Sequence, residues 1–332
     1  MRVFKQTNKQ IDMKNKLLAV LATLSMVASA SAVKVNDNLS INGFIDGSYA
    51  LTDTGAAKTQ SLEVDEVELN FVTNVGNVSS LIAVDSDLND AANTDLGIEQ
   101  AHFTYNVNDA ISLTFGRYGS ALGFEREDPS GLYTYSRAYT NNGFNFGDVD
   151  SSTFDGFSVA YSGDAYSVAV SLHNASADAH SLETNDLDFE VSFTYAGIAG
   201  VNIGGGFTVD NEPTGTSETD AANLSVSRQF GKLFVAGEYS TRDTQANGSG
   251  TAASDLDAYM ILADYDLNNK LGVALRISSE ELSATTDYDK VTIAPNYAIT
   301  ESLGAILEYS DTSHDTANKD SDEIALELTY TF

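Results

Sequence analysis

Short stretches in which apolar and polar residues alternate follow one another from residue 39 to the last residue, 332. The last stretch, residues 323–332, reads EIALELTYTF and has an apolar or aromatic side chain at every second position. Successive side chains of a β-strand point to opposite faces of the sheet, so this period predicts strands with one apolar and one polar face. Beyond residue 32 there is no apolar run of the ~18 residues that a membrane-spanning helix needs. The chain is therefore predicted to be all-β.

The connections between the predicted strands alternate in length. Short turns such as 74–77 and 162–165 take turns with longer polar loops such as 52–61, 89–94 and 119–153. Short turns at one rim and long loops at the other are typical of bacterial outer-membrane barrels. Closing the sheet also pairs every strand edge, and an unpaired edge would be unfavourable in lipid. The pattern favours a transmembrane, antiparallel, up-and-down β-barrel over a soluble sandwich or propeller.

The count of alternating stretches is about sixteen, and one misplaced hairpin would make it 14 or 18. A barrel of that size has a lumen wide enough for water. Two irregularities are expected. Leu62 and Val64 fall out of phase with Val67, which predicts a bulge near Asp65. Pro295 lies inside a predicted strand, where it indicates either a bulge or a strand end.

The first 32 residues have the pattern of a secretory signal peptide. Met13-Lys14-Asn15-Lys16 precedes the apolar run LLAVLATLSMVASASA, which ends in Ala30-Ser31-Ala32. A basic start, a short apolar core and an A-x-A end are its signature. Residues 1–12 add nothing to it, which makes Met13 a candidate for the true translation start. We expect residues 1–32 to be removed and residues 33–332 to form the barrel.

Composition argues against several classes of function. A net charge of −31 disfavours binding to nucleic acid. The chain has no Cys, so it has no thiol nucleophile and no thiolate metal site. Its four His are scattered, and neither G-x-S-x-G nor H-E-x-x-H occurs. Residues 85–90 begin like a calcium loop but lack the glycine and final glutamate of an EF-hand. We expect no catalysis, cofactor or metal.

The longest connection, within residues 115–154, does not alternate and concentrates arginine, acidic and tyrosine residues. A structureless segment of that length points to a functional role. Its charges would either line the constriction of a pore or pair with one another to hold the loop against the wall. The candidate constriction residues are Arg117, Glu125, Arg126, Glu127, Asp128 and Arg137.

Arg117 falls on the lipid-facing phase of its strand. Either a bulge at Gly116 turns it inward or it lies beyond the membrane edge. The polar strand faces carry more acids than bases, and a channel with low-dielectric walls focuses such a field. We therefore expect a preference for cations. The candidate lumen-facing charges are Glu66, Glu68, Asp85, Asp87, Glu190, Arg276 and Lys290.

The chain resembles Gram-negative outer-membrane porins. It ends in Tyr330-Thr331-Phe332, like the C-terminal strand that assembly machinery reads in such barrels. The strand count is that of the general-diffusion porins, and the long loop is the third long loop, which folds inward in those porins. Gly116-Arg117, Gly123-Phe124-Glu125 and residues 135–139, YSRAY, are similar to the G-R, G-x-E, Y-S-R-x-Y pattern of a family described as putative β-barrel porins. One departure is Arg126, which splits the acidic run that many general porins carry.

The resemblance implies an outer-membrane porin that is exported through the periplasm and admits small hydrophilic solutes and ions by passive diffusion. Its implied partners are outer-membrane lipid, lipopolysaccharide, the barrel-assembly machinery that would read Tyr330 and Phe332, and further copies of the chain in a homotrimer. The alternative is a non-conducting barrel that serves as an adhesin, a receptor or a structural protein of the envelope. The sequence leaves open which solutes pass and whether the barrel is a trimer or a monomer.

Overall fold

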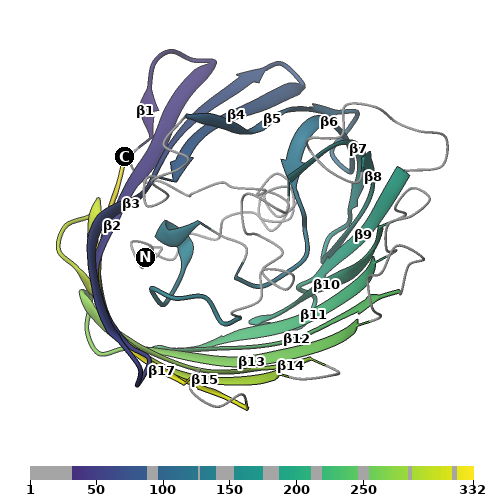
Figure 1. The fold of residues 1–332 in the computed structure, drawn as a ribbon. Helices are drawn as coiled ribbons and strands as arrows, with labels where there is room; N and C mark the ends of the chain where they lie inside the picture. Colours follow the sequence, from purple (N-terminus) through teal and green to yellow (C-terminus); the bar gives the residue numbers. More distant parts are fainter. Residues whose placement is uncertain are drawn as a thin grey trace.

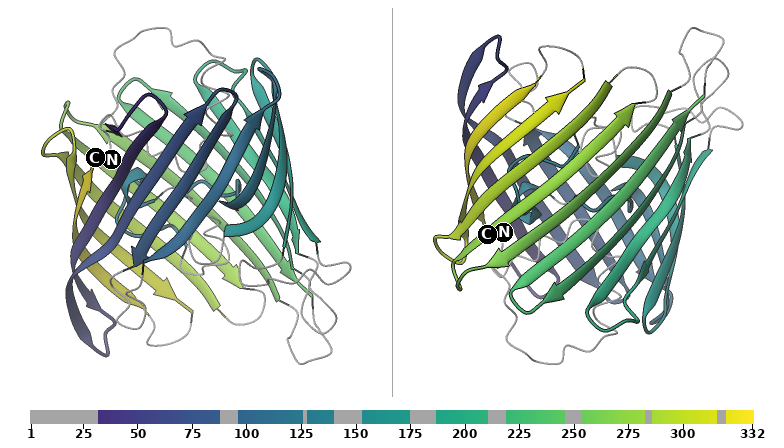
Figure 2. Two further views of the ribbon diagram at one scale, coloured as in Figure 1. Left: turned by 90° about the horizontal axis from the view of Figure 1, so that it is seen from above. Right: turned by 90° about the horizontal axis from the view of Figure 1, so that it is seen from below.

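The computed structural model describes residues 32–87, 96–125, 128–139, 153–174, 187–210, 219–245, 254–282, 286–315 and 320–332. The predicted signal peptide, apart from Ala32, lies outside these residues, as does the end of the calcium-like segment 85–90. The described chain forms a closed antiparallel barrel of tilted strands (Figures 1 and 2). In the described ranges, no helix is long and apolar enough to cross a membrane.

Strands β2 to β17 each pair with their neighbours in the chain, and β17 pairs with β2 to close the ring of sixteen. This confirms the predicted fold class. The two-residue β1 pairs with the start of β2. The strands are β1 (Val33–Lys34), β2 (Leu39–Asp53), β3 (Lys58–Val75), β4 (Val78–Asp87), β5 (Gly97–Asn106), β6 (Ile111–Gly119), β7 (Thr153–Ser162), β8 (Tyr166–Asn174), β9 (Leu187–Tyr195), β10 (Val201–Asp210), β11 (Thr219–Phe230), β12 (Leu233–Thr244), β13 (Ser254–Asp266), β14 (Leu271–Leu282), β15 (Thr286–Ala298), β16 (Leu303–His314) and β17 (Ser321–Thr331).

The two faces of the strands differ as the alternation predicts. Along β14, Leu275 and Ile277 are about half exposed on the outside, whereas Arg276 between them is buried. Connections at one rim are short, for example between β3 and β4, and those at the other rim include the long segment between β6 and β7. The first connection at the long-loop rim is shorter than predicted, because β2 continues to Asp53 and β3 begins at Lys58.

The bulge predicted near Asp65 is confirmed. Asp46 pairs with Glu66 and Gly47 pairs with Val64, so Asp65 is the extra residue on β3. The expectation for Pro295 was wrong on both alternatives. The β15–β16 ladder stops after Ile293 and resumes at Asn296 in the same register, and the strand continues to Ala298. Proline has no backbone N–H to donate. The gap in the β15–β16 ladder accommodates this, because no carbonyl of β16 is then paired with Pro295.

Closure of the barrel extends to the last residue. Phe332 and Gly43 exchange two backbone hydrogen bonds, both of 3.1 Å, so the C-terminal residue is paired with β2. The Phe332 ring stacks on Tyr330 with 5.9 Å between the ring centroids. The terminal aromatic is therefore part of the seam that closes the sheet.

Candidate functional site: a loop bound inside the barrel

Residues 120–125 and 128–139, from the segment between β6 and β7, lie inside the barrel and are called the inner loop below (Figure 1). Three buried glutamates of the barrel wall accept hydrogen bonds from its backbone. They lie on β9, β12 and β16, so the loop is held at widely separated points of the circumference. The pairs are Ala121 N to Glu190 Oε1 (2.9 Å), Phe124 N to Glu238 Oε1 (2.6 Å) and Ser136 N to Glu308 Oε2 (3.2 Å). Backbone groups that lack a strand partner are thus satisfied by wall side chains.

Arg276 on β14 makes the largest set of contacts to the inner loop. Its side chain is 0% exposed, and Nη1 lies 2.7 Å from Glu125 Oε1. Its other contacts reach the returning part of the loop. Nη1 donates to Ser136 O at 2.8 Å, and Nη2 donates to Arg137 O at 2.8 Å. A planar guanidinium with five donors suits this arrangement, because it can serve several acceptors at fixed angles.

Glu125 joins the two arms of the inner loop to each other. Its Oε2 accepts a 2.6 Å hydrogen bond from Ala138 N, while Arg137 donates to its backbone oxygen. On the wall, Lys290 Nζ donates to Arg137 O at 3.2 Å, and Ser278 Oγ donates to Ala138 O at 2.5 Å. The residues around Glu125 are therefore fixed both to one another and to β14 and β15.

Apolar packing covers the same side of the lumen. The ring of Tyr133 stacks on Phe234 of β12 with 5.1 Å between centroids, and Phe124 lies on the same ring at 6.3 Å. Beneath them are small or aliphatic residues from β12 to β16: Ala236, Leu262, Ala274, Ala294 and Ile306. The inner loop is thus packed on the β12–β16 wall.

Two tyrosines of the inner loop are buried with polar partners. The Tyr135 hydroxyl lies 3.2 Å from Ser48 Oγ of β2, and burial raises the pKa of Tyr135 to about 12. Tyr139 donates to Glu238 Oε2 at 3.2 Å, and burial raises its pKa as well. Both phenols are therefore neutral at physiological pH and act as hydrogen-bond donors or acceptors without adding charge.

A cavity of about 760 Å³ lies between the inner loop and the wall formed by β6 to β12. Many of its lining residues are Ser, Thr, Asn and Gly, and its charged residues are Asp164 and Glu190, with no basic residue among those described. Hydroxyl groups and two acids thus line this cavity together with apolar side chains.

Of the predicted constriction residues, Glu125, Asp128 and Arg137 lie in the inner loop, whereas Arg126 and Glu127 fall outside the described residues. Arg117 lies elsewhere. Gly116 has a φ of +128°, but the β5–β6 pairing runs through it without a shift, so Arg117 keeps the outward phase of Phe115. It pairs with Asp155 at 2.9 Å, with 26% of its side chain exposed. The structure thus places Arg117 on the outer face of the barrel.

The predicted lumen-facing charges lie on inward phases. Glu68, Glu190, Arg276 and Lys290 are buried, and Glu66 and Asp85 are half-buried. For Asp87 the strand is described, but the side chain lies outside the described part. The roles of Glu238 and Glu308 in holding the loop were not predicted. Their loop partners are far away in sequence, 172 residues in the case of Ser136 and Glu308, so periodicity gives no signal of the pairing.

Comparison with known proteins agrees with this geometry. Residues 56–332 match the model of a family described as "Putative beta-barrel porin-2, OmpL-like". No curated protein sequence matches the chain significantly.

Solved structures share the fold at low sequence identity. An anion-selective porin from Comamonas acidovorans has a TM-score of 0.67 and 11% identity over 89% of this chain and 99% of its own. The channel DcaP of Acinetobacter baumannii has a TM-score of 0.68 and 14% sequence identity, over 91% of this chain and 100% of its own. OmpF of Salmonella typhi has a TM-score of 0.69 and 13% sequence identity, over 91% of this chain and 100% of its own. The chain belongs to the putative beta-barrel porin-2, OmpL-like family and is a β-barrel protein of the outer membrane.

Proposed function

We propose that the protein is a porin through which small hydrophilic solutes and ions diffuse passively, without catalysis. The observation that carries this proposal is the cavity of about 760 Å³ beside the inner loop. A loop packed on one wall would narrow the lumen and still leave room for solutes to pass, as a diffusion pore requires. Membership in a porin family supports the same reading.

Conductance and solute permeation test this proposal. Purified full-length barrel in a planar lipid bilayer should give discrete current steps, and liposomes that contain it should swell in small sugars at rates that fall with sugar size. Absence of both current and swelling, with the barrel folded, would favour the non-conducting alternative, an adhesin, a receptor or an envelope structural protein.

We further propose that the pore prefers cations. Among the described residues, the buried charged side chains are eleven acids and two bases, with histidine counted as neutral. The fold itself does not determine the sign of selectivity, since one similar structure is described as an anion-selective porin. The excess of acids in a low-dielectric channel favours cations near the wall.

In a KCl gradient, the reversal potential should make the dilute side positive, because K⁺ crosses faster than Cl⁻. D164N, which removes an acid of the cavity lining, should reduce that potential. D109N removes an exposed acid of another turn and should leave it unchanged. A potential of the opposite sign in the wild type would refute cation preference.

We propose a homotrimer embedded in outer-membrane lipid and lipopolysaccharide. One of the similar structures is described as a trimer form of OmpT from Vibrio cholerae. The apolar outward faces of the strands are compatible with either lipid or a neighbouring copy. The mass of the detergent-solubilised particle, measured by light scattering with the detergent contribution subtracted, distinguishes the trimer from a monomer.

Deleting Phe332 should reduce assembly in the outer membrane. The deletion removes the two backbone hydrogen bonds to Gly43, each about 0.5–1.5 kcal/mol, and the terminal aromatic that we propose the assembly machinery reads. The measurement is the amount of folded barrel in outer-membrane fractions, detected by its altered gel mobility without heating. F230A, which removes an exposed aromatic near the same rim, is the control and should assemble normally.

A further inference from the structure

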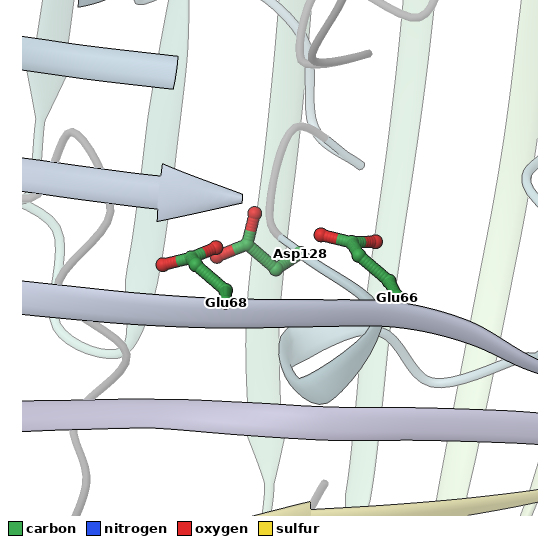
Figure 3. A group of neighbouring side chains, drawn as sticks. All are labelled: Glu66, Glu68 and Asp128. Atoms are coloured by element: carbon green, nitrogen blue, oxygen red, sulfur yellow. The ribbon is translucent and has the colours of Figure 1, made fainter. Parts of the chain in front are cut away.

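Three carboxylates meet where the inner loop approaches β3 (Figure 3). Oxygens of Glu66, Glu68 and Asp128 all lie within 4.8 Å of one another. Asp128 comes from the loop and reaches in between the two glutamates, which share the lumen side of β3 (Figure 3). Glu68 is 1% exposed and Asp128 is 7% exposed, so water screens their charges weakly.

Glu68 also presents an oxygen that the protein does not satisfy. Its Oε1 accepts a hydrogen bond from Asn70 Nδ2, which fixes the orientation of the carboxylate. Its Oε2 is buried and has no hydrogen-bond partner among the described residues, and the same holds for Oε1 of Glu66. A buried carboxylate oxygen without a partner is unfavourable. These carboxylate oxygens therefore indicate a cation as the ligand, one that is coordinated by oxygen atoms.

The spacing agrees with a calcium ion. Ca²⁺ binds oxygens at about 2.3–2.6 Å, so two ligands on opposite sides of one ion lie up to about 5 Å apart. Three oxygens spread evenly around one Ca²⁺ lie up to about 4.5 Å apart. The oxygens of this cluster lie within 4.8 Å of one another, so small rotations of the side chains bring all three to one ion. Mg²⁺ binds at about 2.0–2.1 Å and needs its oxygens closer together than Ca²⁺ does. Water in the lumen can complete the coordination.

We infer that Glu66, Glu68 and Asp128 form a divalent-cation site, best suited to Ca²⁺, that joins the inner loop to β3. The backbone of Asp128 is positioned for this role, because its carbonyl accepts a 2.7 Å hydrogen bond from Gly131 N in the adjoining 3₁₀ turn, Pro129–Gly131. The ion would hold the loop at β3, whereas Arg276 holds it at β14. This site is independent of the proposed passage of solutes.

The test is titration of CaCl₂ into chelator-treated, full-length folded barrel, followed by calorimetry and by the thermal unfolding temperature. We expect one site per chain, with a dissociation constant on the order of 10⁻⁴ to 10⁻³ M and stabilisation that rises with Ca²⁺ concentration. E68Q and D128N should each weaken binding at least tenfold. D128N changes the loop alone, so it remains informative if E68Q folds poorly.

The matched control is E327Q, which changes another buried wall glutamate, on β17, outside the cluster. It should bind Ca²⁺ like the wild type. The inference is overturned if the wild-type barrel shows no calcium binding or stabilisation, or if E68Q and D128N bind as tightly as the wild type. The first result would mean that protons or a protein cation neutralise the cluster. A barrel that conducts but binds no Ca²⁺ contradicts this inference alone and leaves the proposed pore intact.

Discussion

R276A is expected to lower the free energy of unfolding by about 3–5 kcal/mol, because removing one partner of a buried ion pair leaves the other charge uncompensated. Glu125 would keep its buried carboxylate, and the carbonyls of Ser136 and Arg137 would each lose one of their donors. With these contacts gone, the inner loop should leave the β12–β16 wall, and single-channel current should become larger and noisier. Urea unfolding and bilayer recording measure the two effects.

Two further variants separate the ion pair from a general effect of losing an arginine. E125Q/R276M removes both charges and should recover part of the lost stability, since no buried charge remains unpaired. R228A removes an arginine that lies 4.6 Å from the Phe230 ring, and it should cost about 0.5–1 kcal/mol at most. An R276A barrel with wild-type stability and current would show that Arg276 does not hold the loop.

Excising the connection between β6 and β7 should give a wider pore. Gly119 and Thr153 are directly paired at the end of the β6–β7 ladder, so a two-residue Asn-Gly turn can replace residues 120–152. The barrel should still close, because its strand pairing does not involve the loop. We expect higher single-channel conductance than in the wild type and swelling of liposomes in sugars that the wild type excludes.

The control for excision is a replacement of residues 175–186, the connection between β8 and β9, by an equally short turn. That variant should keep the wild-type conductance if the loop between β6 and β7 is the one that narrows the pore. Equal conductance of the wild type and the variant without residues 120–152 would contradict a role for this loop in restricting passage.

Much of the fold could be predicted from the sequence because strand faces follow a local rule. The period of two located the sixteen strands, and a phase slip of Leu62 and Val64 located the bulge at Asp65. Pro295 was mispredicted, because the sequence indicates a missing N–H but not whether a neighbouring strand can leave a gap opposite it.

The site was less accessible to prediction, since its contacts join residues far apart in the chain. The alternation shows that the Arg276 and Glu190 side chains face the lumen. It does not show which residues of the loop they contact. The same limit applies to the carboxylate cluster, because Glu66 and Glu68 are neighbours on one strand whereas Asp128 is distant in sequence. No metal site was predicted from the sequence. The alternation already placed Arg117 on the outward phase of its strand. It was nevertheless grouped with the constriction residues, because it lies next to the charged loop in the sequence.

We propose that the inner loop closes the β12–β16 side of the lumen and leaves the β6–β12 side open to solutes. Because the chain has no Cys, a single introduced thiol reports on its own position. Ser225 lines the cavity, whereas Ser278 is buried under the loop and bonded to Ala138 O. In a conducting bilayer, a cationic methanethiosulfonate reagent should rapidly reduce the current through S225C and leave S278C unchanged. Equal modification at both positions, or no effect on the current at S225C, would contradict this placement of the inner loop.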